Sequence, residues 1–248
     1  MHYLVKTLLA SVLFLTAASV YAHEEEAEEE VVKPWEGAGE FGFVNTTGNT
    51  ESQALNLKLN FIRTGERWRH RFTGTALMTS ENGDKDNERY TMEVQSDRSL
   101  SERSWLFGAF RWDADKFGSY DPQLSLTTGY GRQLMKSEKH ELRGEIGGGY
   151  RKLEARETGQ TTSEFIGRFL LDDSWQVFAS TLWTNRILVE AGSSNTFTQF
   201  NSGLAVSMNS KFAVKLGYEV RHNTDVPVGI SDSENTDTIT SVNLVYNF

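Results

Sequence analysis

Apolar and polar side chains alternate along most of the chain from residue 35 onward. In residues 55–61, LNLKLNF, the leucines and the phenylalanine occupy one parity, and the asparagines and the lysine occupy the other. A period of two predicts a β-strand with one apolar and one polar face. One strand alone does not say which face meets water, so the composition of the two faces along the whole chain has to decide.

Clusters of glycine, asparagine, aspartate and serine separate the alternating runs, which is typical of a β-meander. Twelve runs can be counted, with approximate limits 35–45, 51–63, 67–78, 88–98, 104–113, 123–134, 140–152, 161–171, 174–187, 197–208, 210–222 and 236–248. The connections at one end are mostly longer: 46–50, 79–87, 114–122, 153–160, 188–196 and 223–235. Those at the other end are shorter: 64–66, 99–103, 135–139, 172–173 and 209. Outer-membrane barrels have this asymmetry between tight turns and loops.

The two faces of the predicted strands differ in composition. One parity carries large apolar side chains, such as Phe72, Leu126 and Phe169. The opposite parity is ionic and holds Lys58, Arg69, Arg71, Arg89, Glu93, Arg111, Glu141, Arg143, Glu145, Arg151, Glu164, Arg168, Lys215, Glu219 and Arg221. A membrane barrel has an apolar outer face and a polar lumen. We therefore predict an all-β fold, a single antiparallel transmembrane β-barrel of the bacterial outer membrane with about twelve strands, over residues 35–248. Ten or fourteen strands are alternatives, and a soluble β-sandwich, which also alternates, is the competing fold.

Tryptophan placement favours the barrel over the sandwich. All six tryptophans fall near the ends of predicted strands: Trp35, Trp68, Trp105, Trp112, Trp175 and Trp183. Such placement predicts two aromatic girdles at the membrane interfaces, whereas a soluble core would bury tryptophan centrally. Trp105 breaks the parity of its neighbours Leu106 and Phe110, so we expect a register change or a bulge there.

The N-terminal segment predicts export. Lys6 precedes an apolar run from Leu8 to about Val20, and a small-residue cleavage site ends at Ala22, so residues 1–22 are predicted to be a cleaved signal peptide. Residues 23–34 begin HEEEAEEE, a like-charge block that predicts a disordered periplasmic tail. The net charge of -9 argues against a nucleic-acid partner, and without any cysteine the chain is not held together by disulfides.

The last predicted strand carries a second targeting feature. Its sequence, TDTITSVNLVYNF, places Val242, Leu244, Tyr246 and Phe248 on one face. This strand resembles the β-signal read by the outer-membrane barrel insertion machinery. The resemblance implies that this machinery is a partner, and that outer-membrane lipid and lipopolysaccharide surround the folded barrel.

The segment from about Trp35 to Phe248 resembles the YdiY-like family of salt-induced outer membrane proteins, whose function is unknown. The stretch WEGAGEFGFVNTTGNTESQALN carries the resemblance, with Thr47, Gly48, Asn49 and Thr50 between a glycine-containing strand and a strand of alternating leucines. The resemblance implies a barrel and an association with salt or osmotic response. It provides no catalytic residue.

The charged residues on one face of the predicted strands allow two functional interpretations. In the first, the charges form rings that set the selectivity of a narrow passive channel for small hydrophilic solutes or ions. In the second, they are cross-strand ion pairs that fill a closed structural barrel supporting the envelope. An enzyme ranks third, because His70, His140 and His222 show no convergent nucleophile and base. The sequence contains no phosphate-binding loop or paired-cysteine site, so we expect no cofactor and no metal.

Overall fold

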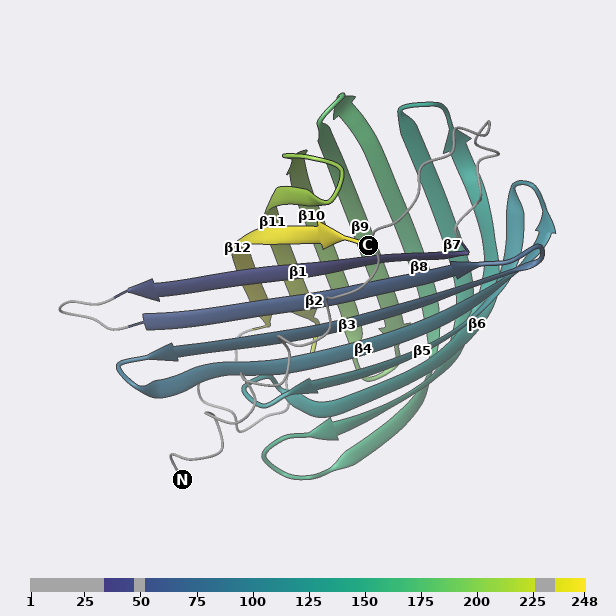
Figure 1. Ribbon diagram of the computed structural model, residues 1–248. Helices are drawn as coiled ribbons and strands as arrows, with labels where there is room; N and C mark the ends of the chain where they lie inside the picture. The colour runs from purple at the N-terminus through teal and green to yellow at the C-terminus, as the bar shows by residue number, and fades with distance from the viewer. Residues whose placement is uncertain (1–33, 47–51, 226–234) are drawn as a thin grey trace. The chain divides into compact units, whose positions relative to one another are not determined.

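The computed structural model describes residues 34–46, 52–225 and 235–248. Its twelve strands are β1 Trp35–Thr46, β2 Ser52–Thr64, β3 Trp68–Glu81, β4 Asp84–Ser101, β5 Ser104–Asp115, β6 Tyr120–Lys136, β7 His140–Ala155, β8 Thr161–Phe178, β9 Thr181–Gly192, β10 Thr196–Ser207, β11 Phe212–Asn223 and β12 Thr236–Asn247. Each strand pairs antiparallel with the next, and β12 pairs with β1 to close a barrel (Figure 1). The predicted twelve-stranded antiparallel barrel is confirmed.

The predicted signal peptide and most of the predicted acidic tail lie outside the described residues. Both remain predictions. No helix within the described ranges is long and apolar enough to cross a membrane.

Several strands are longer than predicted. β8 continues through the predicted turn at 172–173 and ends at Phe178. The predicted loop 79–87 is a tight hairpin, in which only Asn82 and Gly83 separate β3 from β4, with φ angles of 51° and 89°. Asparagine followed by glycine suits such a turn, because both residues adopt positive φ. The polar residues around this turn continue the ladder because their backbone groups stay paired.

The predicted asymmetry between the two barrel ends is present, but most connections at the loop end are shorter than predicted. We call one end the turn end, which carries Trp35, Phe248 and the connections 65–67, 102–103, 137–139, 179–180 and 208–211. The opposite, loop end carries 47–51, 82–83, 116–119, 156–160, 193–195 and 224–235. Only the last of these is long, because polar runs that resembled loops are the ends of strands.

The barrel wall has an apolar outside and a charged inside. On the outer face, Ile146 is 66% exposed and Phe165 is 84% exposed. On the inner face, Arg151 and Arg168 are only 1% and 3% exposed. Apolar side chains are thus exposed and charged ones buried, the reverse of a soluble protein. This confirms the alternation predicted from the sequence, with the apolar residues pointing outward.

The tryptophans gather at one end rather than at two. The exposed members of the turn-end group are Trp35, Trp68, Trp175 and Trp183. Trp175 pairs with Trp183 across the β8–β9 hairpin, with ring centroids 6.2 Å apart, because the turn lies later in the sequence than predicted. Trp112 stands apart toward the loop end. Tryptophan therefore meets the expectation of two aromatic girdles only at the turn end. Toward the loop end the exposed aromatic side chains include Phe43, Phe117, Tyr150 and Phe165.

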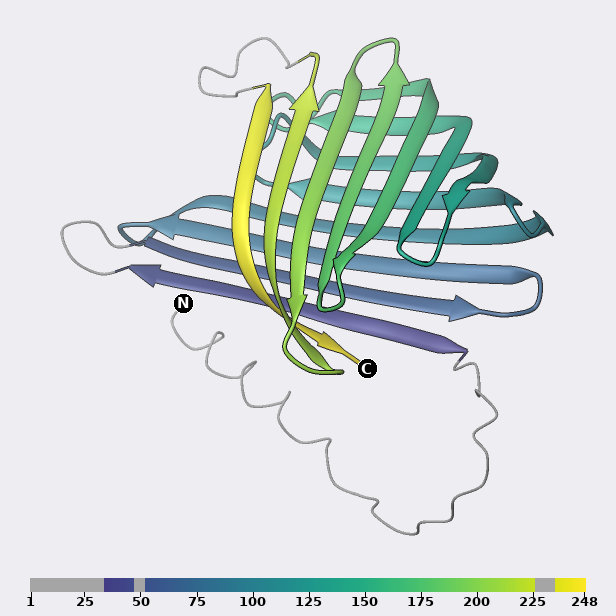
Figure 2. The ribbon, with the colours of Figure 1, turned by 90° about the horizontal axis from the view of Figure 1, so that it is seen from above.

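The seam between β1 and β12 is short. Residues 38–41 pair with residues 244–247, whereas the ladder between β10 and β11 extends over residues 197–207. Figure 2 shows β12 running beside β11 and bending to follow β1 only near its C-terminal end. The backbone groups of Gly37 and Phe248 exchange two further hydrogen bonds of 3.2 and 3.0 Å. Barrel closure therefore depends on the last few residues of the chain.

Candidate functional site

The candidate site is the barrel interior, where alternate residues of every strand converge. Because side chains alternate across a strand, every second residue of each strand points into the barrel, and the charged residues predicted from the sequence lie at these positions. A charged group removed from water needs partners to offset its desolvation. The interior therefore has to be described by its pairings.

Arg151 on β7 makes three hydrogen bonds in the interior, although its Nε has no hydrogen-bond partner. Its guanidinium donates to the Glu164 carboxylate at 2.6 Å and to the backbone carbonyls of Glu190, at 3.2 Å, and Asn195. Ser194 N–H donates to the same Glu164 carboxylate at 2.7 Å. These bonds tie β7 and β8 to the connection between β9 and β10.

Ion pairs also cross the interior between strands that are not neighbours. Arg221 on β11 donates to Asp113 on β5 at 2.7 Å, and Arg111 donates to the same carboxylate at 2.8 Å. Arg89 on β4 donates to Glu219 on β11 at 2.9 Å. These contacts connect opposite walls of the barrel through its middle.

A second set of crossings lies nearer the turn end. Arg168 on β8 donates to Glu145 on β7 at 2.8 Å and to Gln95 on β4 at 3.3 Å. Arg186 on β9 donates to Glu93 on β4 at 2.7 Å. Together the two sets occupy the interior with paired charges.

Near the seam, two lysines share one carboxylate. Lys215 on β11 donates to Glu40 on β1 at 2.8 Å, and Lys58 on β2 lies 3.9 Å from the same group. This cluster joins β2 and β11 to β1, beside the short β1–β12 ladder. It therefore adds side-chain contacts where backbone pairing is sparse.

Three aromatic residues inside the barrel escaped the sequence prediction: Trp105, Phe107 and Phe197, all buried. Arginine guanidinium groups stack on their rings, with Arg143 4.4 Å from the Trp105 centroid and Arg168 4.6 Å from the Phe107 centroid. Arg111 and Arg221 lie 4.5 and 5.2 Å from the Phe197 centroid. Such cation–π contacts gain strength when they are desolvated.

Glycines of β6 make room for these inward rings. A side chain at Gly131 would overlap the Trp105 ring, and one at Gly129 would approach the Phe107 ring to 2.8 Å. The parity break at Trp105 was visible in the sequence, and a register shift does lie beside it, between Ser99 and Ser101 on β4, where Ser99 pairs with Trp105. Trp105 points inward because the neighbouring strand presents no side chain there.

The predicted interior residues at the turn end are less tightly paired. Arg71 lies 3.8 Å from Asp97 and 3.5 Å from Asp172, and Arg143 lies 3.6 Å from Asp97. The side chain of Arg69 makes no hydrogen bond or ion pair with the described residues, although its backbone belongs to the strand ladder. Glu141 is exposed at this end and does not join the buried network.

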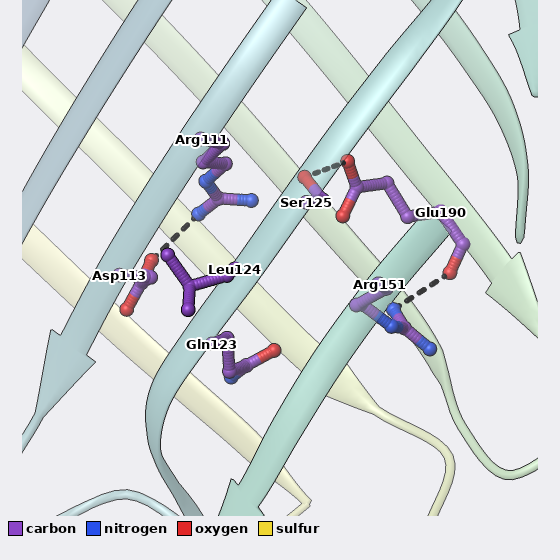
Figure 3. Close-up of a pocket in the computed structure, with 7 residues that line it drawn as sticks. All are labelled: Arg111, Asp113, Gln123, Leu124, Ser125, Arg151 and Glu190. Carbon is purple, nitrogen blue, oxygen red and sulfur yellow. Dashed lines mark hydrogen bonds and ion pairs between the residues drawn. The ribbon is translucent and has the colours of Figure 1, made fainter. Parts of the chain in front are cut away.

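Two small pockets lie between these side chains. The pocket in Figure 3 is lined by Arg111, Asp113, Gln123, Leu124, Ser125, Arg151 and Glu190 and has a volume of about 10 Å³. A second pocket beside it, also of about 10 Å³, shares Glu190. Each has room for a single water molecule.

The three described histidines, His70, His140 and His222, lie at the barrel ends. His70 is exposed and stacks on Trp68, and its ring hydrogen-bonds Ser96 at 2.9 Å. His140 lies 2.6 Å from Asp173 at the turn end, and His222 hydrogen-bonds Thr236 at 2.9 Å. In the part of the chain that the structure describes, no group of three or more histidine, aspartate or glutamate side chains could hold a metal ion.

A separate ion cluster marks the loop end. Lys85 donates to Glu88 at 2.6 Å, and Lys116, in the connection between β5 and β6, hydrogen-bonds the same carboxylate. The hydrogen bond to Glu88 raises the pKa of Lys116.

Comparison with known proteins identifies relatives of unknown function. The family model described as "Protein of unknown function, DUF481" matches residues 39–248. The "Uncharacterized protein YdiY" of Escherichia coli (strain K12) is 30% identical over 214 residues, covering 86% of this chain and 83% of that protein. The resemblance stated from the sequence is confirmed.

Solved structures of other β-barrels resemble this chain with low sequence identity and TM-scores below 0.5. The translocator domain of the autotransporter NalP from Neisseria meningitidis has a TM-score of 0.49 at 12% identity, covering 89% of this chain and 90% of that chain. The COG4313 outer membrane channel from Pseudomonas putida F1 has a TM-score of 0.47 at 12% identity, covering 90% and 99%. The fold assignment rests on the strand pairing of the chain itself.

Proposed function

The chain belongs to the DUF481 family of unknown function, and we propose that it is an outer-membrane barrel protein whose lumen is closed by its own charged side chains. The apolar outer face supports the membrane location, because such a surface would be costly to expose to water and matches the hydrocarbon of a bilayer. Lipid and lipopolysaccharide would contact this face, and the barrel insertion machinery would place it there.

The cross-barrel ion pairs are the observation that carries the closed lumen. Arg221–Asp113 and Arg89–Glu219 connect opposite walls, and two pockets between the buried side chains each have room for about one water molecule. A passage for hydrated solutes would require these pairs to separate. The closed barrel would then have a structural role in the envelope and would not transport solutes.

A narrow channel for small hydrophilic solutes or ions is the second candidate. The loose pairing of Arg71 and Arg143 favours it, because side chains without short hydrogen bonds can rearrange at lower cost. In this interpretation the turn end would set charge selectivity, as rings of charged side chains do in channels.

Conductance in planar lipid bilayers separates the two candidates. For the closed barrel we expect no discrete conductance steps from the purified full chain. The double variant Arg221→Ala/Asp113→Ala should admit small, discrete steps, because it removes both partners of one crossing. Discrete steps from the unaltered protein, with ion selectivity changed by Arg71→Gln, would overturn closure and establish the channel.

The link to salt or osmotic response rests on the family resemblance alone. If the closed barrel supports the envelope, a deletion strain should grow more slowly than its parent in high salt and recover when the gene is restored. Equal growth of the two strains over a range of salt concentrations would contradict this role.

A further inference from the structure

We propose that the turn end of the barrel interior binds a small anion with two or more oxygen atoms, such as phosphate or a dicarboxylate. The site consists of Arg69 and Arg71 on β3 and Arg143 on β7, and we call it the arginine site. It goes beyond the proposed function, because it requires neither a closed nor an open lumen.

The arginine site is short of acceptors. Its nearest carboxylates are Asp97 and Asp172, at 3.5 to 3.8 Å, which is longer than the 2.7–2.9 Å of a charge-assisted hydrogen bond. Nε and Nη2 of Arg71 are buried and have no hydrogen-bond partner in the described structure. A buried donor without a partner is costly, so an acceptor at this position would stabilise the barrel.

The middle of the lumen provides the contrast. There Arg151, Arg168 and Arg221 each have a carboxylate oxygen at 2.6 to 2.8 Å. Arg151 Nε and Arg89 Nη1 in the middle also lack a hydrogen-bond partner, but both guanidinium groups keep a contact of 2.6 to 2.9 Å with a carboxylate. Within the described ranges, no guanidinium group of the arginine site has a carboxylate that close.

The charge balance at the arginine site also favours an anion. Asp172 is shared with Arg186, at 3.6 Å. Glu145, the next carboxylate inward, is already occupied by Arg168, at 2.8 Å, and by the Trp105 indole N–H, at 3.2 Å. Within 4 Å of the three guanidinium groups, the described residues provide only two carboxylates, Asp97 and Asp172, and both are partly committed.

Neighbouring groups hold the site in place. The Trp105 ring supports the Arg143 guanidinium at 4.4 Å, and Gln95 donates to Asp97 at 2.8 Å. Arg71 and Arg143 keep 11% and 17% of their side-chain surface accessible. Solvent therefore reaches part of both side chains, and planar guanidinium groups can bind carboxylate or phosphate oxygens in pairs.

The test is a titration of the purified full chain in detergent with inorganic phosphate and with succinate, against potassium chloride at equal ionic strength. We expect both anions to bind and to raise the temperature of barrel unfolding more than chloride does. Arg71→Gln and Arg143→Gln should each weaken binding at least about tenfold, since each removes charge-assisted hydrogen bonds. Arg71→Lys should weaken it too, because it keeps the charge but loses the planar fork.

Arg98→Gln is the matched control, because Arg98 is exposed on the outer parity of β4 near the same end. It should bind phosphate as the unaltered chain does. Equal effects of phosphate, succinate and chloride would overturn the proposal, as would equal weakening by Arg98→Gln and Arg71→Gln. Phosphate binding without succinate binding would restrict the site to phosphate groups.

Discussion

At the scale of single residues, stability depends on keeping buried charges paired. Arg151 and Glu164 are 1% and 6% exposed and 2.6 Å apart. Removing one partner of such a pair leaves an uncompensated buried charge, whereas replacing both partners costs much less.

We predict that Arg151→Met lowers the free energy of unfolding by about 3–5 kcal/mol. The double variant Arg151→Met/Glu164→Gln should recover a large part of that loss, because no buried carboxylate is left unpaired. Urea unfolding in detergent micelles measures both. A double variant less stable than Arg151→Met would show that the pair does not act in this way.

At the scale of the strands, β6 and β7 approach each other through glycine. A side chain at Gly147 would overlap the Thr128 carbonyl, and one at Gly149 would overlap the Leu126 carbonyl. Backbone atoms cannot move aside as a flexible side chain can, so these glycines are required by the close approach.

We predict that Gly147→Val and Gly149→Val each destabilise the barrel by about 1–3 kcal/mol or more, through overpacking. Gly167→Val on β8 is the control, since no atom lies within 4 Å of the position that its Cβ would occupy. The urea midpoint should fall for the first two variants and stay near the unaltered value for the third. A similar change in all three would point to a general cost of valine in these strands.

The sequence predicts much of the architecture at this scale, because strand number and facing follow from a local period of two. Strand ends are less predictable, since the polar residues at 172–173 and around Asn82 are equally compatible with a turn or with a paired strand. The backbone partner decides between these, and it comes from elsewhere in the chain.

The interior was predictable only as a set of charged positions. The alternation gave the inward parity of Arg111 and Arg221, but their shared partner Asp113 depends on which strands oppose each other across the barrel. The inward Phe107 and Phe197 were missed because the sequence does not show that small residues on adjacent strands leave space for them.

At the scale of the whole molecule, closure depends on the short β1–β12 seam. Phe248 contributes two backbone hydrogen bonds to Gly37, and its ring lies 5.5 Å from Phe61 and 5.9 Å from Tyr246. An unclosed barrel would expose unpaired backbone groups, which cannot be satisfied in lipid.

We predict that deleting Phe248, or changing Tyr246 and Phe248 to Asp, sharply reduces the folded barrel in outer-membrane fractions. Phe178→Asp is the control, because Phe178 is also exposed near the turn end, on β8. The heat-modifiable gel shift measures the folded fraction. Normal yields from the Phe248 deletion would contradict both the role of the seam and the assembly signal predicted at Val242, Leu244, Tyr246 and Phe248.

The central claim is that the apolar face lies in lipid, and depth-dependent fluorescence quenching tests it most directly. The chain has no cysteine, so single labels can be attached at Ile146→Cys on the outer face of β7 and at Glu157→Cys in the connection between β7 and β8. In vesicles containing brominated lipid, the account predicts strong quenching of the label at position 146 and little at position 157. Equal, weak quenching at both positions, together with reaction of the unlabelled Ile146→Cys variant with a water-soluble maleimide, would contradict the account.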